Sequence, residues 1–420
     1  MASQIEPGGK IAVIGAGIVG VCCAAELSDA GYQVTLIDRA KPGIGGPSRV
    51  NAGHIAGASI LPLASPATFK NIPSLLLDPQ SPLIVPQRYG LRILPWLYHF
   101  AFACRTQTYM NGVRALADLN SMLWGCTNDL YARAGISGQL SIPGALFLYE
   151  TEHSFHRAQE GWRLSEKFGV KTDTVTAERL GELEPNLALH YFAAVRADSW
   201  GVVSDPLKIV EGIADYYAIG KGANLIHGSV SGVTPKTNGV AVRLDTGERY
   251  LMDGIVIAAG AWSKHLTRQL NERIPLEVER GYNVTSATSD TQINHALVFT
   301  DRGMVATQLS NAIRVGGLDE LGGLHLAENP ALHQRVRDLA EEFVLNFDAS
   351  NATSWMGHRP SMPDSLPVIG QAKISNRILY AFGHGHYGLT HAPATGRLIT
   401  ELAQGHSPAI NLHPFSSKRF

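Results

Sequence analysis

The stretch that decides the fold is Lys10–Gly20, which reads Lys-Ile-Ala-Val-Ile-Gly-Ala-Gly-Ile-Val-Gly. An apolar run enters a glycine turn here, and a helix-compatible segment leaves it toward Ala30. A second apolar run then ends on an acid, Asp38. A strand, glycine turn, helix, second strand and carboxylate in this order are typical of a dinucleotide-binding unit.

The three glycines have separate tasks in such a unit. Gly15 permits the tight turn, Gly17 lets the backbone approach a pyrophosphate, and Gly20 lets the helix pack closely on the strand. The start of the helix offers N–H groups and a partial positive charge to the phosphates. Asp38 is placed to accept hydrogen bonds from a ribose diol and would repel a 2′-phosphate, which disfavours NADP. The motif alone leaves NAD, FAD and a βαβ unit without a nucleotide open.

The composition describes a globular chain. Its 420 residues, 45% apolar and 17% charged, are enough for two domains and exclude a disordered protein. The net charge is only −1, and the charged residues form no long runs of one sign. Binding of nucleic acid is therefore not expected. The segment before Lys10 has no apolar signal core, which predicts a cytoplasmic protein. The cysteines show no metal-binding spacing and are expected to be inert thiols: Cys22, Cys23, Cys104 and Cys126.

One apolar, aromatic segment lies within residues 83–104, after Arg88 and Arg92. It is too short to span a bilayer but would suit an interfacial contact. A buried helix start is the favoured alternative. The proline-rich residues 61–95 before it predict a long irregular connection.

Elsewhere the hydrophobic periodicity alternates between helix and strand. Helices are predicted over 96–135, 152–168, 177–184, 207–219, 330–343 and from about 388 to 403. Strands are predicted over 144–149, 223–227, 239–244, 248–251 and 378–382, and strands dominate 276–318. Residues 253–263 are predicted to form a buried strand that ends in a turn of small residues.

Five motifs together resemble the family of FAD-dependent D-amino-acid dehydrogenases and oxidases, whose relatives include glycine and sarcosine oxidases. They fall in the family's order and cover nearly the whole chain: the fingerprint, Ser48–Gly53 (Ser-Arg-Val-Asn-Ala-Gly), 258–263 (Ala-Ala-Gly-Ala-Trp-Ser), Gly357–Pro360 with Pro363-Asp364, and Gly383–Leu389. The resemblance implies an α/β fold, in which a Rossmann-like FAD-binding domain is interleaved with a substrate domain of antiparallel sheet plus helices. The implied FAD-binding segments are 1–95, 195–270 and 355–420, and the implied substrate-domain segments are 96–194 and 271–354.

The resemblance also implies one FAD held along the whole chain. All the cysteines precede residue 127, whereas some relatives attach flavin through a cysteine in the last third, so FAD is expected to be non-covalent. The adenosine and pyrophosphate are expected to meet Gly15, Ala16, Gly17, Ile18, Val19, Gly20, Asp38, Arg39, Val230, Ala259, Gly260 and Trp262. The isoalloxazine ring is expected to meet Ser48, Asn51, Ala52, Gly53, His54, Gly383, His384, Gly385, His386, Tyr387, Gly388, Leu389 and Thr390. A helix N-terminus at Gly388 would stabilise negative charge on the reduced ring.

Arg359 matches the arginine that holds the substrate carboxylate in this family. The planar guanidinium pairs with a carboxylate through two parallel hydrogen bonds and so fixes the direction of the Cα–H bond. Arg280 and Tyr282 are candidates for a second clamp and a hydroxyl lid, with ordinary strand residues as the alternative. His54 and Tyr387 are candidates for facing the substrate amine or the flavin.

A metal site at His384, His386 and His391 is not expected. No acid or cysteine lies in that segment, and the glycines there are already explained by close approach to the cofactor.

These features predict FAD-dependent oxidative deamination of D-amino acids, with D-proline and hydroxy-D-proline among the substrates considered, by hydride transfer from Cα to flavin N5. Electrons would pass to a quinone or respiratory carrier, with peripheral contact of 83–104 at the inner face of the cell membrane. A glycine or sarcosine-type oxidase that uses O2 and a non-catalytic FAD-binding subunit stay open as alternatives. The sequence leaves the chirality, the side chain of the substrate and the formation of an oligomer undecided.

Overall fold

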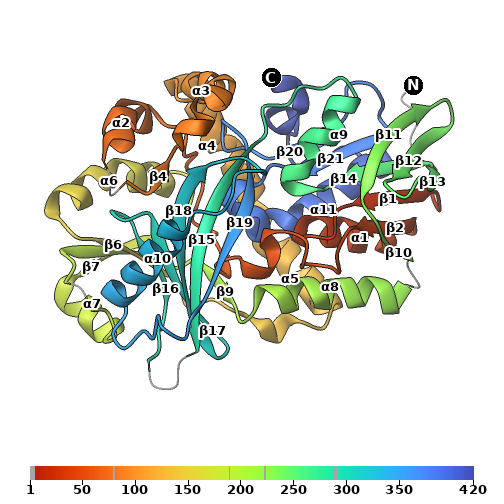
Figure 1. The fold of residues 1–420 in the computed structure, drawn as a ribbon. Coiled ribbons are helices and arrows are strands. Elements are labelled where there is room, and N and C mark those ends of the chain that lie inside the picture. Colours follow the sequence, from red (N-terminus) through yellow and green to blue (C-terminus); the bar gives the residue numbers. More distant parts are fainter. Residues whose placement is uncertain (1–4, 79–80, 189, 222–223, 288–290) are drawn as a thin grey trace.

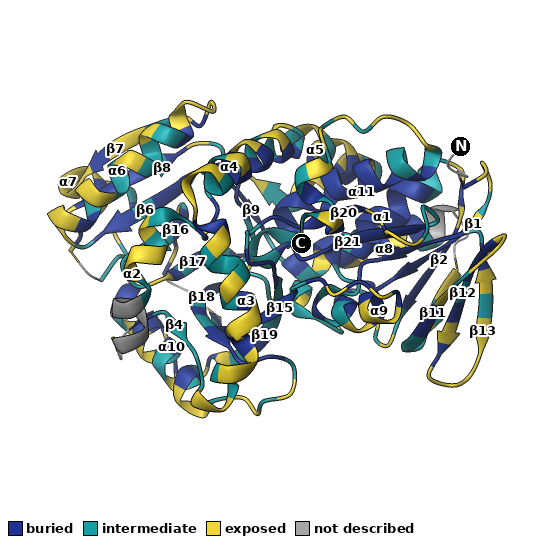
Figure 2. Ribbon diagram, turned by 90° about the horizontal axis from the view of Figure 1, so that it is seen from above, coloured by how far each residue is buried: buried dark blue, intermediate teal, exposed yellow. Residues whose placement is uncertain are grey.

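The computed structural model describes residues 5–420, except 79–80, 189, 222–223 and 288–290. A six-stranded sheet and a nine-stranded sheet lie side by side, with two three-stranded sheets beside them (Figure 1). The buried residues gather in the strands and in the helices that cover them, and the exposed residues gather on the outer helices (Figure 2).

The predicted dinucleotide unit is confirmed as β1 (Lys10–Ile14), α1 (Ile18–Asp29) and β2 (Gln33–Asp38). These strands belong to the six-stranded sheet, whose order is β10-β2-β1-β14-β21-β20. The other members are β10 (Asn224–His227), β14 (Gly254–Ile257), β21 (Ile378–Phe382) and the antiparallel edge strand β20 (Val368–Gln371). The order reverses at β1, so the carboxyl ends of β1 and β14 form the switch point where such sheets bind ligands.

Each face of this sheet has its own cover. Val13 packs with the helices α1, α8 (Pro206–Lys221) and α11 (Gly388–Gln404). Ala12 and Ile14 pack on the opposite side, against α9 (Ser263–Gln269) and the sheet of β11 (Val230–Lys236), β12 (Gly239–Leu244) and β13 (Arg249–Met252). Alternate residues of β1 therefore hold two layers together, as the period of a strand requires.

The nine-stranded sheet has the order β19-β15-β18-β17-β16-β6-β8-β7, with β4 paired to β18. Its strands are β4 (Leu83–Ile84), β6 (Ala145–Tyr149), β7 (Thr172–Thr176), β8 (Ala193–Ala197), β15 (Glu277–Ala287), β16 (Ala296–Phe299), β17 (Met304–Leu309), β18 (Ala312–Leu321) and β19 (Thr353–Ser361). Helix α10 (Pro330–Phe343) packs on its outer face, and α6 (Glu152–Glu166) and α7 (Ala177–Leu183) lie at its far end. The small sheet of β3 (His54–Ile55), β9 (Gly201–Val203) and β5 (Leu140–Ser141) joins the two halves.

Two parts of the chain pack differently from the implied division into domains. Helices α4 (Thr106–Ser121) and α5 (Leu123–Arg133) share the core of α1 and α11, and Arg133 forms ion pairs with Glu26 and Asp29 of α1. Strand β19 extends the nine-stranded sheet, although its residues 355–361 fall within the implied FAD-binding segment 355–420. Side-chain packing and strand pairing decide both placements, and neither is visible in local periodicity.

The prediction of an irregular connection over 61–95 is wrong in part. Helix α2 (Pro66–Leu77) and the start of α3 (Gly90–Ala103) lie within it. Pro66 takes the first helical position, where the missing N–H is not needed. Among the described residues, no helix combines the length and the apolar character needed to cross a bilayer.

The packing of α1 on β1 generates a test at Gly20. A Cβ on Gly20 would lie 1.8 Å from the carbonyl oxygen of Gly15, whereas a Cβ on Gly125, also within a helix, meets open space. We expect Gly20→Ala to lower the free energy of unfolding by about 1–3 kcal/mol and to abolish retention of flavin. Gly125→Ala should instead raise that free energy by about 0.5–1 kcal/mol. Urea unfolding and flavin absorbance after gel filtration measure both effects, and equal behaviour of the two variants would contradict the prediction.

Candidate active site

A cavity of about 600 Å³ lies between the carboxyl ends of the six-stranded sheet and the inner face of the nine-stranded sheet. The turn after β1, the segments 43–54, 258–262 and 383–389, and strands β15, β18 and β19 line it. Residues more than 360 positions apart in the sequence therefore share one wall. A cavity of this volume, bordered by a helix N-terminus and by polar side chains, fits a cofactor beside a small substrate.

The β1–α1 turn forms one end of the cavity. Gly15 adopts a φ of +109°, and a Cβ there would lie 2.5 Å from the carbonyl oxygen of Ala258. The Ile18 amide donates a hydrogen bond to Ser48 Oγ over 3.0 Å. Asp38 Oδ2 accepts a bond of 2.7 Å from the Ala16 amide, which holds the carboxylate at the cavity wall. Bare backbone and an oriented carboxylate are what the phosphates and ribose of a dinucleotide require.

Arg39 and Trp262, both predicted to meet adenosine, lie together at one end of the cavity. The guanidinium of Arg39 lies over the Trp262 ring, 4.0 Å from its centroid, and donates to the carbonyl oxygen of Gly45 over 3.1 Å. Val230, Ala259 and Gly260 line the same end. The structure thus brings together the residues predicted for adenosine, although they come from four separate segments.

The loop of residues 47–54, which is predicted to flank the flavin, is fixed to the nine-stranded sheet. Asn283 Nδ2 donates to the carbonyl oxygen of Val50 over 2.9 Å, and Arg314 Nη1 donates to that of Asn51 over 2.6 Å. Burial lowers the pKa of Arg314 to about 10, so this guanidinium stays charged at neutral pH. Sequence reasoning missed both residues, although their alternation with Gly281 and Gly316 places all four on the cavity face.

The opposite flavin-side segment is the turn that leads into α11. Gly383 and Gly385 have φ values of +81° and +52°, and Gly388 and Leu389 at the start of α11 line the cavity. The buried His384 contacts Thr395 Oγ1 through Nε2 over 2.9 Å. The predicted helix N-terminus therefore faces the cavity, where it favours negative charge.

Several predicted cofactor residues lie behind the wall and hold it in place. The side chain of Asn51 accepts from the Gly53 amide over 2.8 Å, and Thr390 Oγ1 accepts from the Ala56 amide over 3.0 Å. Ala16 and Gly20 act through the turn described above. Asn51 also lines the cavity, whereas Ala16, Gly20 and Thr390 shape the site without lining it.

Arg359 lies in the cavity wall on β19. Its guanidinium lies against Gly281 of β15, where a Cβ would come within 2.1 Å of the guanidinium carbon. Nη1 donates to the carbonyl oxygen of Leu318 over 3.0 Å and also forms an ion pair with Asp319. The arginine that is predicted to bind the substrate carboxylate is therefore already paired with the carboxylate of Asp319.

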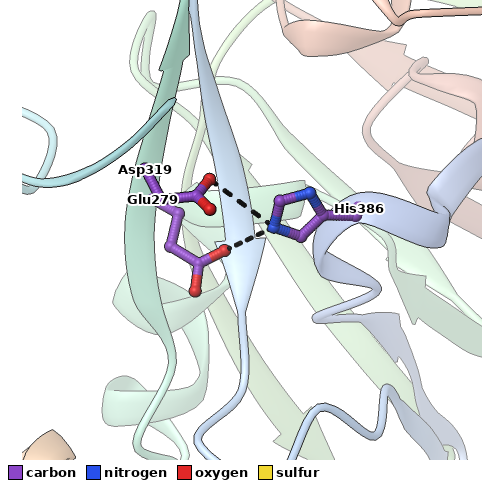
Figure 3. Close-up of side chains that lie close together, drawn as sticks. All are labelled: Glu279, Asp319 and His386. Carbon is purple, nitrogen blue, oxygen red and sulfur yellow. Dashed lines mark hydrogen bonds and ion pairs between the residues drawn. The ribbon is translucent and has the colours of Figure 1, made fainter. Parts of the chain in front are cut away.

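Glu279, Asp319 and His386 form a cluster (Figure 3). Arg359 adjoins it through an ion pair with Asp319. His386 Nε2 lies 3.1 Å from Glu279 Oε2 and 3.6 Å from Asp319 Oδ1. Burial would raise the pKa of Glu279, but its bonds to His386 and Ser361 and the charge of Arg359 outweigh burial and leave the pKa lowered. The acids reach His386 from β15 and β18, so a search for partners within its own segment could not find them.

Arg280 and Tyr282 are placed differently from what their predicted roles require. Arg280 is fully buried and pairs with Glu320 over 3.2 Å, and the Tyr282 hydroxyl donates to the same carboxylate over 2.6 Å. Tyr282 contributes to the cavity lining, but its ring packs against His333 of α10, whereas Gly281 lies directly against Arg359. Strand alternation sends 280 and 282 to one face and 279 and 281 to the other, so a clamp and a lid do not follow from this geometry.

His54 and Tyr387 both line the cavity. His54 Nε2 lies 2.7 Å from Thr307 Oγ1, and its ring meets Trp200 edge to face. Burial lowers the pKa of His54 to about 4, so the ring is neutral at pH 7. A neutral ring among Trp200 and Phe147 forms an apolar wall beside the flavin-side loop.

Comparison with known proteins agrees with this geometry. A sequence profile of the family described as "DAO: FAD dependent oxidoreductase" matches residues 10–402. The chain belongs to this family. It is an FAD-dependent oxidoreductase, and the prediction of FAD as the cofactor is confirmed.

Individual relatives cover nearly the whole chain. A protein of Bradyrhizobium diazoefficiens named D-amino-acid oxidase is 36% identical over 98% of this chain and 99% of its own. D-amino acid dehydrogenase 2 of Mesorhizobium japonicum is 29% identical over 96% of this chain and 98% of its own. The crystal structure of glycine oxidase from Geobacillus kaustophilus superimposes with a TM-score of 0.76 at 22% identity, covering 98% of this chain and 99% of that one, which confirms the predicted fold.

The buried His391 predicts how the stability of the protein depends on pH. His391 donates through Nε2 to Asn120 Oδ1 over 2.8 Å, and burial lowers its pKa from 6.5 to about 3. Below pH 6.5 His391 binds a proton in the unfolded chain but stays neutral in the folded chain, so the free energy of unfolding falls as the pH falls toward 3. We expect His391→Gln, which keeps an N–H donor, to remove about 2 kcal/mol of the loss of stability between pH 7 and 5. Urea unfolding at several pH values measures this loss, and parallel pH profiles for the two proteins would refute the assignment.

Proposed function

We propose that this FAD-dependent oxidoreductase deaminates D-amino acids, with Arg359 as the anchor of the substrate carboxylate. The observation that carries the proposal is the position of Arg359 in the wall of the same cavity as the α11 N-terminus and the fingerprint turn. The name of the relative that is 36% identical supports the D-amino-acid class. Cyclic substrates such as D-proline and hydroxy-D-proline belong to this class, with a secondary amine in place of a primary one.

The protein's part in this reaction is to bind, orient and exclude water. FAD, when bound, supplies the acceptor for the hydride that leaves the substrate Cα, at flavin N5. Arg359 fixes the carboxylate and so the direction of the Cα–H bond. The amine loses a proton, and the imino acid formed from a primary amine takes up water to give a 2-oxo acid and ammonium. A cyclic secondary amine gives a cyclic imine, whose hydrolysis opens the ring without release of ammonium.

The environment of the flavin also supports this chemistry. The N-terminus of α11 favours the negative charge that reduction brings, and its first residues line the cavity. Trp200, Phe147 and the neutral His54 form the apolar wall that limits access of water. All the cysteine thiols described by the structure lie outside the lining of the cavity, in keeping with a non-covalent cofactor.

Anaerobic reduction of the flavin tests the proposed function. We expect loss of flavin absorbance with D-amino acids and none with L-amino acids, glycine or sarcosine. Arg359→Ala should raise KM about 10- to 100-fold, since it removes charged hydrogen bonds to the substrate, while the exposed Arg157→Ala on α6 serves as a control. An unchanged KM in Arg359→Ala would end this assignment, and a flavin that no amino acid reduces would favour a non-catalytic subunit.

We further propose a quinone or respiratory carrier as the electron acceptor, reached at the inner face of the cell membrane. Helix α3 supports this proposal with an exposed apolar stripe at helical spacing: Leu91, Leu94, Tyr98 and Phe102. Its opposite face, including Ile93 and Trp96, packs on Leu321. Peroxide formed in proportion to substrate would instead point to an oxidase that uses O2.

Vesicle flotation tests this contact with lipid. The exposed Arg88, Arg92 and Arg105 flank the stripe, so we expect binding to vesicles of phosphatidylglycerol and weaker binding to phosphatidylcholine. Leu91→Ser combined with Leu94→Ser should abolish binding, because both side chains would enter the interface. Leu251→Ser, at an equally exposed leucine on β13, is the control. Binding that survives the double substitution would exclude α3 as the contact.

A further inference from the structure

The chain departs from regular strand geometry beside Arg359. Strand β18 pairs Gly317 with Tyr282 and Glu320 with Arg280, so two residues, Leu318 and Asp319, lie opposite the single Gly281. This is a β-bulge, which inserts one residue and changes the face to which the following side chains point. It sends Asp319 toward the cavity and Glu320 toward Arg280 on the other face.

The bulge is held in a strained conformation. Leu318 is a buried residue with a φ of +55°, a region that side chains with a Cβ rarely occupy. In this conformation its carbonyl oxygen accepts the Arg359 Nη1 hydrogen bond of 3.0 Å. Strain of this kind gathers at functional sites, where the surrounding structure maintains it. Here it places an acid directly against the proposed carboxylate anchor.

The ion pair between Arg359 and Asp319 affects which ligands can bind at Arg359. A simple carboxylate that approaches Arg359 meets the negative charge of Asp319 on the same guanidinium. Glu279 adds a second negative charge nearby, already engaged by Ser361 over 2.6 Å and by His386. An amino acid brings a positive group one bond from the same Cα that carries its carboxylate, so it can meet both charges at once.

We propose that Asp319 receives the α-ammonium group of the substrate while Arg359 receives its carboxylate. This inference rests on the proposed function and adds a specificity-determining residue to it. The pair admits zwitterions, with a primary or secondary amine, and disfavours 2-hydroxy acids and the 2-oxo acid product. Specificity then comes from repulsion of the wrong ligand as much as from attraction of the right one.

A metal ion is the other cation that this cluster could hold. Ligand atoms of Glu279, Asp319 and His386 lie within 4.8 Å of one another. The guanidinium of Arg359 already touches Asp319, however, and would lie beside a divalent ion. An ammonium group, with a single charge and hydrogen-bond donors, fits this position better.

The test compares an amino acid with its deaminated counterpart on the FAD-loaded protein. The ligands are the D-amino acid that reduces the flavin fastest and the acid of the same carbon skeleton without the amine, such as propionate for D-alanine. In Asp319→Asn we expect KM for the amino acid to rise about tenfold and Kd for the deaminated acid to fall about tenfold. Flavin absorbance reports the Kd without turnover.

The opposite changes of KM for the amino acid and Kd for the deaminated acid distinguish recognition of the ammonium group by Asp319 from a structural role. A change of KM and Kd in the same direction, or of neither, would overturn the proposal, and Asp118→Asn on the outer face of α4 controls for loss of charge alone. Ligand binding that EDTA abolishes would assign the cluster to a metal ion instead. A flavin that no D-amino acid reduces would reject the proposed function, whereas the carboxylate titration would still report on Asp319.

Discussion

The approach of the β1–α1 turn to β14 is the constraint on which the rest of the structure depends. Backbone meets backbone there: a Cβ on Gly20 would lie 1.8 Å from the Gly15 carbonyl oxygen, and one on Gly15 would lie 2.5 Å from that of Ala258. Helix α1 therefore begins directly above the carboxyl edge of the sheet, with its N-terminus open to the cavity. Any other group that is to act on the same cofactor must reach this edge.

Distant segments reach that edge because cross-element polar contacts hold them. Arg314 and Asn283 of the nine-stranded sheet fix the loop 47–54, and Thr390 of α11 holds Ala56 behind it. The turn before α11 closes the opposite side. The cavity is thus a property of two sheets docked face to edge, which is why the chain passes between them repeatedly.

Acidic and basic side chains alternate beside Arg359. Arg359, Asp319, His386 and Glu279 follow one another within ion-pair distance. A lone charge in a partly dry site is costly, and an alternating series lowers that cost while it leaves each group able to exchange its partner for a ligand. An enzyme of zwitterionic substrates can use both signs in this way.

The sequence alone determined the dinucleotide fingerprint, the family and the candidate carboxylate anchor. The fingerprint can be recognised from spacing alone because its residues lie close together in the sequence: Gly15, Gly17, Gly20 and Asp38. The helices 152–166 and 330–343 were likewise predictable, because their apolar faces repeat at the helical period.

Only the tertiary structure decided which face of β15 meets Arg359. Alternation separates Glu279 and Gly281 from Arg280 and Tyr282, but it does not say which pair points inward. The bulge at Leu318–Asp319 depends on the partner strand, and so does the meeting of Asp319 with Arg359 and His386. Pairing between distant strands determines these contacts, and the local sequence pattern of one strand does not identify the strand with which it pairs.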